Sequence, residues 1–365
     1  MDHALRRRRL GRALQGLGCD GLLVARGPNV RYLTGFTGSN GQVVVAADGR
    51  AVFLTDGRYE EQAAREAPDV ERVVYRDRRA PHHAAAAARA LSVATLGFEA
   101  SLPYREVEAL RAEAGGIRLV PVEGAVERLR WVKDEAEVRA LERAQELTDR
   151  AFEEVLGTLR EGVTEREVAL ALEAAMRRAG AEDRAFPPIV AFGEDAAEPH
   201  HRPADRPLAP GDVVKLDFGA LVDGYHADMT RSVSLGPPPP EVRDLHALVL
   251  RAQEAGIAAL RAGARAREVD RAARAVIEEA GLGERFPHGL GHGVGLEIHE
   301  GPMLWPGGDE EVPAGAVVTV EPGLYVPGLG GVRVEDVVLV APDGPRVLGR
   351  ATRELIALDG WGRER

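Results

Sequence analysis

A glycine-rich run that carries three histidines is the part of the chain best suited to chemistry. His288, His292 and His299 stand among four glycines within residues 288–300, in a chain of 365 residues that has only 10 histidines. Glycine lets the backbone approach a ligand closely and adopt positive φ. Imidazole is a common metal ligand and carries protons near neutral pH. The run predicts one wall of an active site; standing alone, it would also fit a solvated turn.

Two aspartates interrupt strand patterns upstream of this run. Asp217 and Asp228 lie on either side of the pair Asp223-Gly224, which is flanked by β-forming residues. Such a pair is a strong hairpin signal because a two-residue turn needs positive φ. In that hairpin Asp217 faces Thr230, and Asp228 points to the same face as Thr230. The two carboxylates are then diagonal neighbours, roughly 7–8 Å apart at the backbone, and can grip one cation.

A second acidic pair repeats this arrangement near the C-terminus. A hairpin centred on Gly328 would place Glu321 opposite Glu335. Like charges that face each other across a sheet are destabilising, and a buried carboxylate without a partner is costly. Two edge hairpins with solvated acids would avoid both costs, but valine-rich strands flank each acid. The pattern therefore indicates that a cation neutralises the four carboxylates.

The acidic pairs and one histidine make a plausible ligand set for metal ions. Oxygen ligands with a single imidazole suit divalent ions such as Mn²⁺, Co²⁺ or Zn²⁺. Four carboxylates exceed the need of one ion, so two ions that share bridging carboxylates are expected. Mn²⁺ is the preferred choice, with Co²⁺ or Zn²⁺ as alternatives. The predicted metal ligands are Asp217, Asp228, His292, Glu321 and Glu335.

In order and in flanking sequence, this set resembles the pita-bread dinuclear metallopeptidases, which include methionine aminopeptidase, aminopeptidase P and prolidase. Creatinase, a relative of the same fold, lacks the metal ligands that are present here. Two N-terminal motifs, at residues 31–41 and 55–59, resemble the extra domain of the Xaa-Pro-specific branch. The motifs that carry the rest of the resemblance are Leu216-Asp217-Phe218-Gly219, Gly224-Tyr225-His226-Ala227-Asp228, Val320-Glu321-Pro322-Gly323 and Arg333-Val334-Glu335-Asp336.

The resemblance implies an α+β fold in two domains. A smaller α/β domain, ribonuclease H-like as in the creatinase N-terminal domain, is expected over residues 1–125. A pita-bread (creatinase/aminopeptidase-like) catalytic domain is expected over residues 126–365. Residue patterns agree, because strands and helices alternate in the first part and two blocks of paired helices with acidic hairpins follow. Capping boxes at Asp134 and Thr164 predict the start of two of these helices.

The resemblance also implies roles for three histidines outside the ligand set. His200 matches the histidine that faces the substrate and steadies the tetrahedral intermediate. His299 matches the one that holds the scissile carbonyl, and His288 matches a substrate-side histidine. His201, the neighbour of His200, is expected to be solvated.

The same resemblance implies a mechanism. A hydroxide that bridges two metal ions attacks the carbonyl that precedes a proline, and Glu321 acts as the proton shuttle. Arg333 lies two residues before Glu335 and is expected on the same strand face, where it would support the carboxylate cluster. A plain surface arginine is the alternative.

Substrate length separates two expected activities. Aminopeptidase P accepts peptides of varied length, whereas prolidase cleaves only the Xaa-Pro dipeptide and must bind its carboxylate, in some cases with an arginine shortly after the His-Glu-x-Pro stretch. Here Met303 follows that stretch, which favours an Xaa-Pro aminopeptidase over the dipeptidase. A homodimer is expected from the Xaa-Pro branch. A binding protein without metal, or an enzyme that acts on another bond, remains as a further alternative.

Composition fits a soluble enzyme and narrows the partners. A net charge of −11 disfavours nucleic acid as a partner, and the single cysteine suits a reducing cytoplasm. No apolar run has the roughly 18 residues that a membrane span needs. Residues Arg6 to Arg9 lie on a predicted helix with Leu10 and Leu14, and we expect the arginines on its solvated face.

Overall fold

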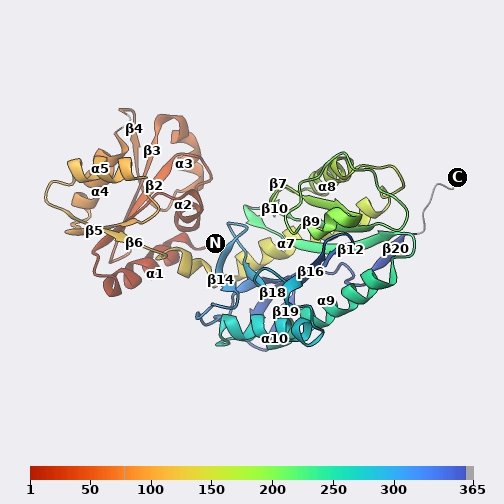
Figure 1. The fold of residues 1–365 in the computed structure, drawn as a ribbon. Helices are drawn as coiled ribbons and strands as arrows, with labels where there is room; N and C mark the ends of the chain where they lie inside the picture. Colours follow the sequence, from red (N-terminus) through yellow and green to blue (C-terminus); the bar gives the residue numbers. More distant parts are fainter. Residues whose placement is uncertain (78, 359–365) are drawn as a thin grey trace. The chain divides into compact units, whose positions relative to one another are not determined.

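The computed structural model describes residues 1–77 and 79–358. The chain divides into two compact units, Met1–Arg130 and Trp131–Arg365, each with its own sheets and core (Figure 1). Within the described residues, none of the helices combines the length and the apolar composition that a membrane crossing requires.

The first unit is a mixed six-stranded sheet, in the order β4-β3-β2-β1-β5-β6, with helices packed against it. Its strands are β1 Gly21–Val24, β2 Gly41–Ala46, β3 Ala51–Asp56, β4 Glu71–Tyr75, β5 Thr95–Glu99 and β6 Arg118–Val122. Its helices are α1 His3–Gly16, α2 Gly27–Thr34, α3 Glu60–Glu66, α4 Ala80–Ala90, α5 Tyr104–Glu113 and α6 Glu127–Arg130, with a 3₁₀ turn at Gly57–Tyr59. This arrangement confirms the expected α/β domain.

Helix α1 corrects one expectation about the arginine run. Arg6 and Arg7 are 3% and 4% exposed rather than solvated. Arg6 donates to the carbonyl of Tyr32 at 3.1 Å, and Arg7 donates to that of Leu33 at 2.8 Å. The last carbonyls of a helix lack partners inside the helix, so these long side chains are drawn inward to the end of α2.

The second unit contains two pairs of helices and several short sheets. Its helices are α7 Glu135–Leu156, α8 Glu165–Ala179, α9 Pro240–Ala259 and α10 Ala266–Glu279, with 3₁₀ turns η2 Gly193–Ala197 and η3 Gly283–Arg285. The strands of its first half are β7 Asp183–Arg184, β8 Ile189–Phe192, β9 Val213–Phe218, β10 Ala220–Val222, β11 Tyr225–His226 and β12 Met229–Leu235. The later strands are β13 Gly291–Gly293, β14 Glu300–Leu304, β15 Val317–Val320, β16 Gly323–Val326, β17 Gly330–Arg333, β18 Asp336–Ala341, β19 Gly344–Val347 and β20 Ile356–Leu358.

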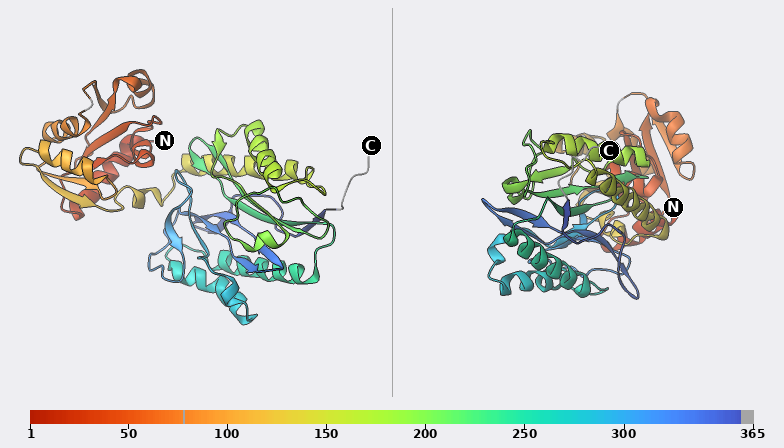
Figure 2. Two further views of the ribbon diagram at one scale, coloured as in Figure 1. Left: turned by 45° about the horizontal axis from the view of Figure 1, so that its top comes forward. Right: turned by 90° about the vertical axis from the view of Figure 1, so that its right-hand side faces the viewer.

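The two helix pairs cover opposite outer faces of these sheets (Figure 2). One core lies between α7, α8 and the sheet β20-β12-β9-β8. The other lies between α9, α10 and the sheet β14-β13-β15-β18-β19. The predicted α+β architecture of two helix-pair blocks is confirmed.

Local signals in the sequence set the ends of the first helix pair. Helix α7 begins at the capping box of Asp134 with Glu137, and α8 begins at that of Thr164 with Glu167. Each box satisfies backbone N–H groups that the first helical turn leaves free. Helix α8 ends at Gly180, which adopts the left-handed conformation that favours glycine.

Candidate active site

The predicted site residues meet in one cavity of about 430 Å³ in the second unit. Its lining includes all nine side chains that the sequence singled out, which are His200, Asp217, Asp228, His288, His292, His299, Glu321, Arg333 and Glu335. Phe186, Ile189, Ile298, Met303 and Trp305 add apolar wall. A cavity with apolar walls and convergent ionisable groups is the usual form of an active site.

The first acidic hairpin has the predicted register. Thr230 pairs with Asp217 between β12 and β9, and Val222 pairs with Tyr225 across the turn. The turn residues Asp223 and Gly224 both have positive φ, at 50° and 74°. Asp217 and Asp228 therefore reach the same cavity.

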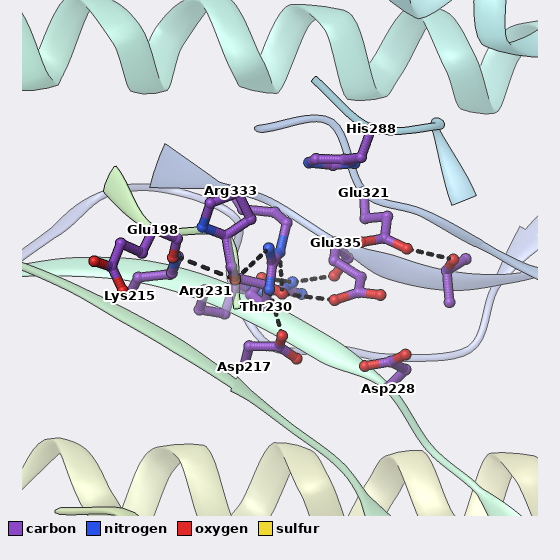
Figure 3. Close-up of polar contacts among 12 residues, drawn as sticks. Glu198, Lys215, Asp217, Asp228, Thr230, Arg231, His288, Glu321, Arg333 and Glu335 are labelled. Atoms are coloured by element: carbon purple, nitrogen blue, oxygen red, sulfur yellow. Dashed lines mark hydrogen bonds and ion pairs between the residues drawn. The ribbon is translucent and has the colours of Figure 1, made fainter. Parts of the chain in front are cut away.

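The second acidic hairpin also has the predicted register. Val320 pairs with Asp336 between β15 and β18, and Gly323 pairs with Arg333 between β16 and β17. Glu321 and Glu335 occupy the interruption between these two ladders and face each other there. Both side chains point into the space that Asp217 and Asp228 enter from the first hairpin (Figure 3).

Burial makes this cluster electrostatically unfavourable without a cation. Asp217, Asp228 and Glu335 are 6%, 5% and 2% exposed. Burial raises the pKa of Asp228 well above its usual value, and the carboxylate of Glu335 raises it further. Burial also raises the pKa of Glu335 well above its usual value, with Glu321 adding to the effect. A bound dication would relieve the repulsion that these shifts report.

His292 is held in the form that a metal ligand requires. Its Nδ1 lies 3.0 Å from the carbonyl of Gly293, so this nitrogen donates and leaves Nε2 free to ligate. Nε2 is 3.3 Å from Glu321 and 3.6 Å from Asp228. Without a metal, Nε2 instead carries a proton: burial opposes ionisation of Glu321, but the hydrogen bond and charge of the protonated His292 ring lower the pKa of Glu321 to about 2.

The donor atoms present fit a divalent metal centre. Oxygen atoms of Asp228 and Glu335 and a ring nitrogen of His292 all lie within 4.8 Å of one another. One oxygen of Asp217, Oδ1, is buried and has no hydrogen-bond partner among the described residues. A buried polar atom without a partner calls for an explanation, and an ion at this position supplies one.

Arg333 binds the carboxylate cluster through Asp217 rather than through Glu335. Its Nη2 forms an ion pair with Oδ2 of Asp217, and its Nε donates to Thr230 at 2.9 Å. Its Nη1 donates to the hydroxyl of Tyr325 at 3.0 Å. Arg333 is 3% exposed, so the alternative of a surface arginine is wrong.

Tyr325 links Arg333 to His288. The Tyr325 hydroxyl accepts from Arg333 and lies 2.9 Å from Nε2 of His288, while Nδ1 of His288 lies 2.8 Å from the carbonyl of Gly289. His288 therefore donates from Nδ1 and accepts at Nε2, and both its ring nitrogens are engaged within the protein. Burial lowers the pKa of His288, which favours this neutral form.

The other two pocket histidines are more exposed. The ring of His299 lies 4.4 Å from that of His292 in an edge-to-face arrangement. Burial lowers the pKa of His299, so its ring is neutral at pH 7. His200 also lines the cavity, as do Pro199 and Phe186. Both rings line the cavity, and the neutral ring of His299 can donate a hydrogen bond to a substrate without carrying charge into the cluster.

Two family models match the chain. Residues 139–342 match metallopeptidase family M24, and residues 6–132 match the creatinase/prolidase N-terminal domain. The chain belongs to metallopeptidase family M24.

Similar proteins span nearly the whole of this M24 metallopeptidase. An Xaa-Pro dipeptidase of Pyrococcus horikoshii is 35% identical over 92% of this chain and 94% of its own length. The structure of an Xaa-Pro dipeptidase from Bacillus anthracis has a TM-score of 0.94 and 39% identity, over 98% of this chain and 100% of that one. The structure of an X-Pro aminopeptidase from Thermotoga maritima has a TM-score of 0.88 and 35% identity, over 95% and 100%. M24 enzymes depend on two metal ions, which agrees with the carboxylate and histidine cluster found here.

One expectation about the M24 site was wrong. His201 is not a solvated neighbour of His200, because its side chain is only 11% exposed and its Nε2 lies 2.8 Å from the buried carboxylate of Glu165. Glu165 also accepts from the backbone N–H groups of Phe192 and Ala204. Glu165, His201 and Asp195 lie close enough to hold an ion, but these hydrogen bonds already occupy both oxygens of Glu165.

Sequence reasoning missed three residues that hold the site together. Thr230 donates to Glu335 at 2.6 Å, Tyr325 links His288 to Arg333, and Lys215 lies fully buried behind the cavity. Only Lys215 left a usable signal. It is one of two lysines among 47 lysine and arginine residues, and it sits two residues before Asp217 on the same face of β9.

Proposed function

We propose that this M24 enzyme hydrolyses the peptide bond between an N-terminal residue and a following proline. The observation that carries the proposal is the convergence of five metal-ligand candidates and three histidines on one cavity. The names of the similar proteins, Xaa-Pro dipeptidase and X-Pro aminopeptidase, supply the substrate class.

The metal ions are proposed to be held by Asp217, Asp228, His292, Glu321 and Glu335. When bound, two such ions polarise water and make it a nucleophile near neutral pH. Mn²⁺ is proposed as the physiological metal, with Co²⁺ or Zn²⁺ as alternatives, since oxygen-rich sites bind several ions and availability decides among them.

The chain's own groups are proposed to handle the proton and the carbonyl. Glu321 stays ionised at neutral pH and can accept a proton within the cavity. The neutral ring of His299 can donate a hydrogen bond to the scissile carbonyl oxygen, where charge develops during attack. His200 is proposed to steady the same intermediate.

Arg333 and His288 are proposed to organise the site without touching the reacting bond. Arg333 fixes one oxygen of Asp217 and thereby directs the other oxygen into the cavity. His288 has both ring nitrogens engaged, so it contributes a fixed wall and holds Tyr325 against Arg333.

Two substrate lengths remain as candidates, each with an observation in its favour. A dipeptide would present its carboxylate inside the cavity, yet Arg333 is the sole lysine or arginine among the described residues that line it, and its donors are occupied. This favours longer peptides and hence an aminopeptidase. The names of the Pyrococcus and Bacillus relatives favour the dipeptide.

Parallel cleavage assays of Ala-Pro and Ala-Pro-Ala, with added Mn²⁺ and with a chelator, test the proposal. Cleavage of both peptides that is lost on chelation would establish an Xaa-Pro aminopeptidase. Cleavage of Ala-Pro alone would establish a dipeptidase. Failure to cleave either peptide by the metal-loaded protein would refute the proposed substrate class. A homodimer and a cytoplasmic location are proposed as well; sedimentation of the purified protein tests the first.

A further inference from the structure

The His200 ring has no polar anchor of its own among the described residues. The ring is exposed in the cavity, and within the described residues no hydrogen bond or ion pair holds it. The other two cavity histidines that are not predicted metal ligands do have ring contacts. His288 contacts Tyr325, and His299 contacts His292. The position of the His200 ring in the cavity therefore depends on the contacts that fix the backbone of residues 192–204.

The side chain of Lys215 binds the segment that directly precedes His200. Its Nζ is 3.0 Å from the carbonyl oxygen of Ala196, 2.5 Å from that of Glu198 and 3.5 Å from that of Pro199. Figure 3 shows Lys215 beside Glu198, with Asp217 on the same strand. One ammonium thus gathers three carbonyls of the four residues that precede His200.

Burying an ammonium group is costly: burial lowers the pKa of Lys215 to about 7, and the carbonyls that accept from its Nζ favour the charged form. Lys215 is 0% exposed, and in the described part of the chain it forms no ion pair with a carboxylate. Its ammonium is a compact charge with three donors, a geometry that the flat fork of arginine cannot reproduce. The chain uses arginine for nearly all of its basic residues but keeps lysine here.

Glu165 fixes the same segment from both ends. One of its oxygens accepts from the N–H of Phe192 at 2.8 Å, before the segment. The other accepts from the N–H of Ala204 at 2.9 Å and lies 2.8 Å from Nε2 of His201, after His200. Glu165 is 0% exposed and begins helix α8, so the helix carries this anchor.

We propose that Lys215 and Glu165 are positioning residues that place His200 for catalysis. The proposal rests on the proposed function, in which His200 meets the substrate. Neither residue touches the cavity itself, since neither is among its lining residues. Both bind the backbone of residues 192–204, so their loss should mimic the loss of His200; Lys215 also lies over the ring of Tyr325, with Nζ 5.2 Å from the ring centroid.

Double-mutant cycles with His200→Ala test the proposal. Lys215→Met and Glu165→Gln are made alone and combined with His200→Ala, and kcat and KM are measured on Ala-Pro and Ala-Pro-Ala together with metal content. Each single variant should lose roughly 10–100-fold in kcat and keep two metal equivalents and a KM within about threefold. Neither should lose more when His200 is already absent, because residues that act as one unit are not additive.

Two further variants separate positioning from general damage. Arg7→Met removes another buried cation that holds backbone carbonyls, but in the first unit; it should lower stability and keep kcat. Lys215→Arg keeps the charge without the three-donor geometry and should recover only part of the lost kcat. Additive losses with His200→Ala, loss of metal, or a full kcat in Lys215→Met would each overturn the proposal.

A measurement that does not depend on activity distinguishes the positioning of His200 from the proposed peptidase function. The ring signal of His200 in NMR spectra, assigned by its absence in His200→Ala, should shift in Lys215→Met and Glu165→Gln but not in Arg7→Met. If the wild-type protein cleaved no Xaa-Pro peptide while these shifts occurred, the proposed function would fail and the positioning would stand. An unchanged His200 signal in both variants would refute the positioning.

Discussion

Arg333 occupies one oxygen of the buried Asp217 carboxylate, and within the described part of the chain the other oxygen has no hydrogen-bond partner. The two residues come from different hairpins, so this pair joins the two halves of the metal-ligand cluster. Asp217 is fixed in orientation by Arg333, and its unpaired oxygen is the one available to a cation. We therefore expect Arg333 to support metal binding through Asp217, in line with the supporting role that the sequence analysis expects of it.

Replacing Arg333 with lysine tests this link. A lysine keeps the charge but cannot bind Asp217, Thr230 and Tyr325 at once, because it lacks the planar fork. We expect Arg333→Lys to lose roughly 10–100-fold in kcat/KM and in metal affinity, as for other groups that orient a ligand. The control is Arg346→Lys, which makes the same exchange in the half-exposed surface ion pair of Arg346 with Glu142. Equal metal affinity of Arg333→Lys and wild type would contradict the assignment.

The raised pKa values of Asp228 and Glu335 predict a metal-free protein that weakens as the pH rises. Both groups have a pKa well above the ordinary values of 3.8 and 4.5. A group whose folded pKa is raised adds stability below its unfolded pKa and loses it as the pH rises through the folded pKa. Chelated protein should therefore be less stable at pH 8 than at pH 5.5, as urea unfolding can measure.

Asp228→Asn should reverse this loss and abolish the metal centre. Without metal at pH 8, the variant should be more stable than wild type by on the order of 1–3 kcal/mol, because it removes a buried repulsive charge. With Mn²⁺ added, wild type should be the more stable, since an ion stabilises only the protein that binds it. An active Asp228→Asn enzyme with two metal equivalents would show that Asp228 is not a ligand.

The sequence predicted which acidic side chains converge on the cavity, because the information that places them is local. The turn at Asp223-Gly224 fixes the register that sets Asp217 opposite Thr230, and Gly328 does the same for Glu321 and Glu335. A hairpin register follows from a few adjacent residues. The side chains that face the cavity could therefore be derived before any contact between the two hairpins was known.

The supporting contacts could not be derived in this way, because they join residues far apart in sequence. His201 was expected in solvent, yet it contacts Glu165, 36 residues away. Arg6 and Arg7 were assigned to a solvated face, yet they bind carbonyls 26 residues away. Helical periodicity places an arginine on one side of a helix; it does not show which carbonyl lacks a partner there.

His201 gives a pH dependence that can be separated from the metal site. Burial lowers the pKa of His201, but its hydrogen bonds with Glu165 and Glu198 outweigh this and leave the pKa raised above 6.5. The protonated ring thus stabilises the fold below pH 6.5, and this contribution is lost as the pH rises through the folded pKa. Wild type should exceed His201→Gln in stability by more at pH 5.5 than at pH 8.5. A constant difference over that range would show that folding does not raise the pKa of His201.

Met303 provides the test of substrate length. Its side chain is 44% exposed, lines the cavity, and lies near Trp305, which is 50% exposed. An arginine at this position would add a cation to a wall whose one arginine is fully engaged. We expect Met303→Arg to lower KM for Ala-Pro about tenfold relative to Ala-Pro-Ala, since a charge-assisted hydrogen bond to the dipeptide carboxylate contributes on the order of 1.5–3 kcal/mol before solvent screening. Met303→Gln, which adds a polar group without charge, should leave the ratio near that of wild type. If Met303→Arg leaves the ratio unchanged, the carboxylate of the dipeptide does not reach this wall, and length is selected elsewhere in the enzyme.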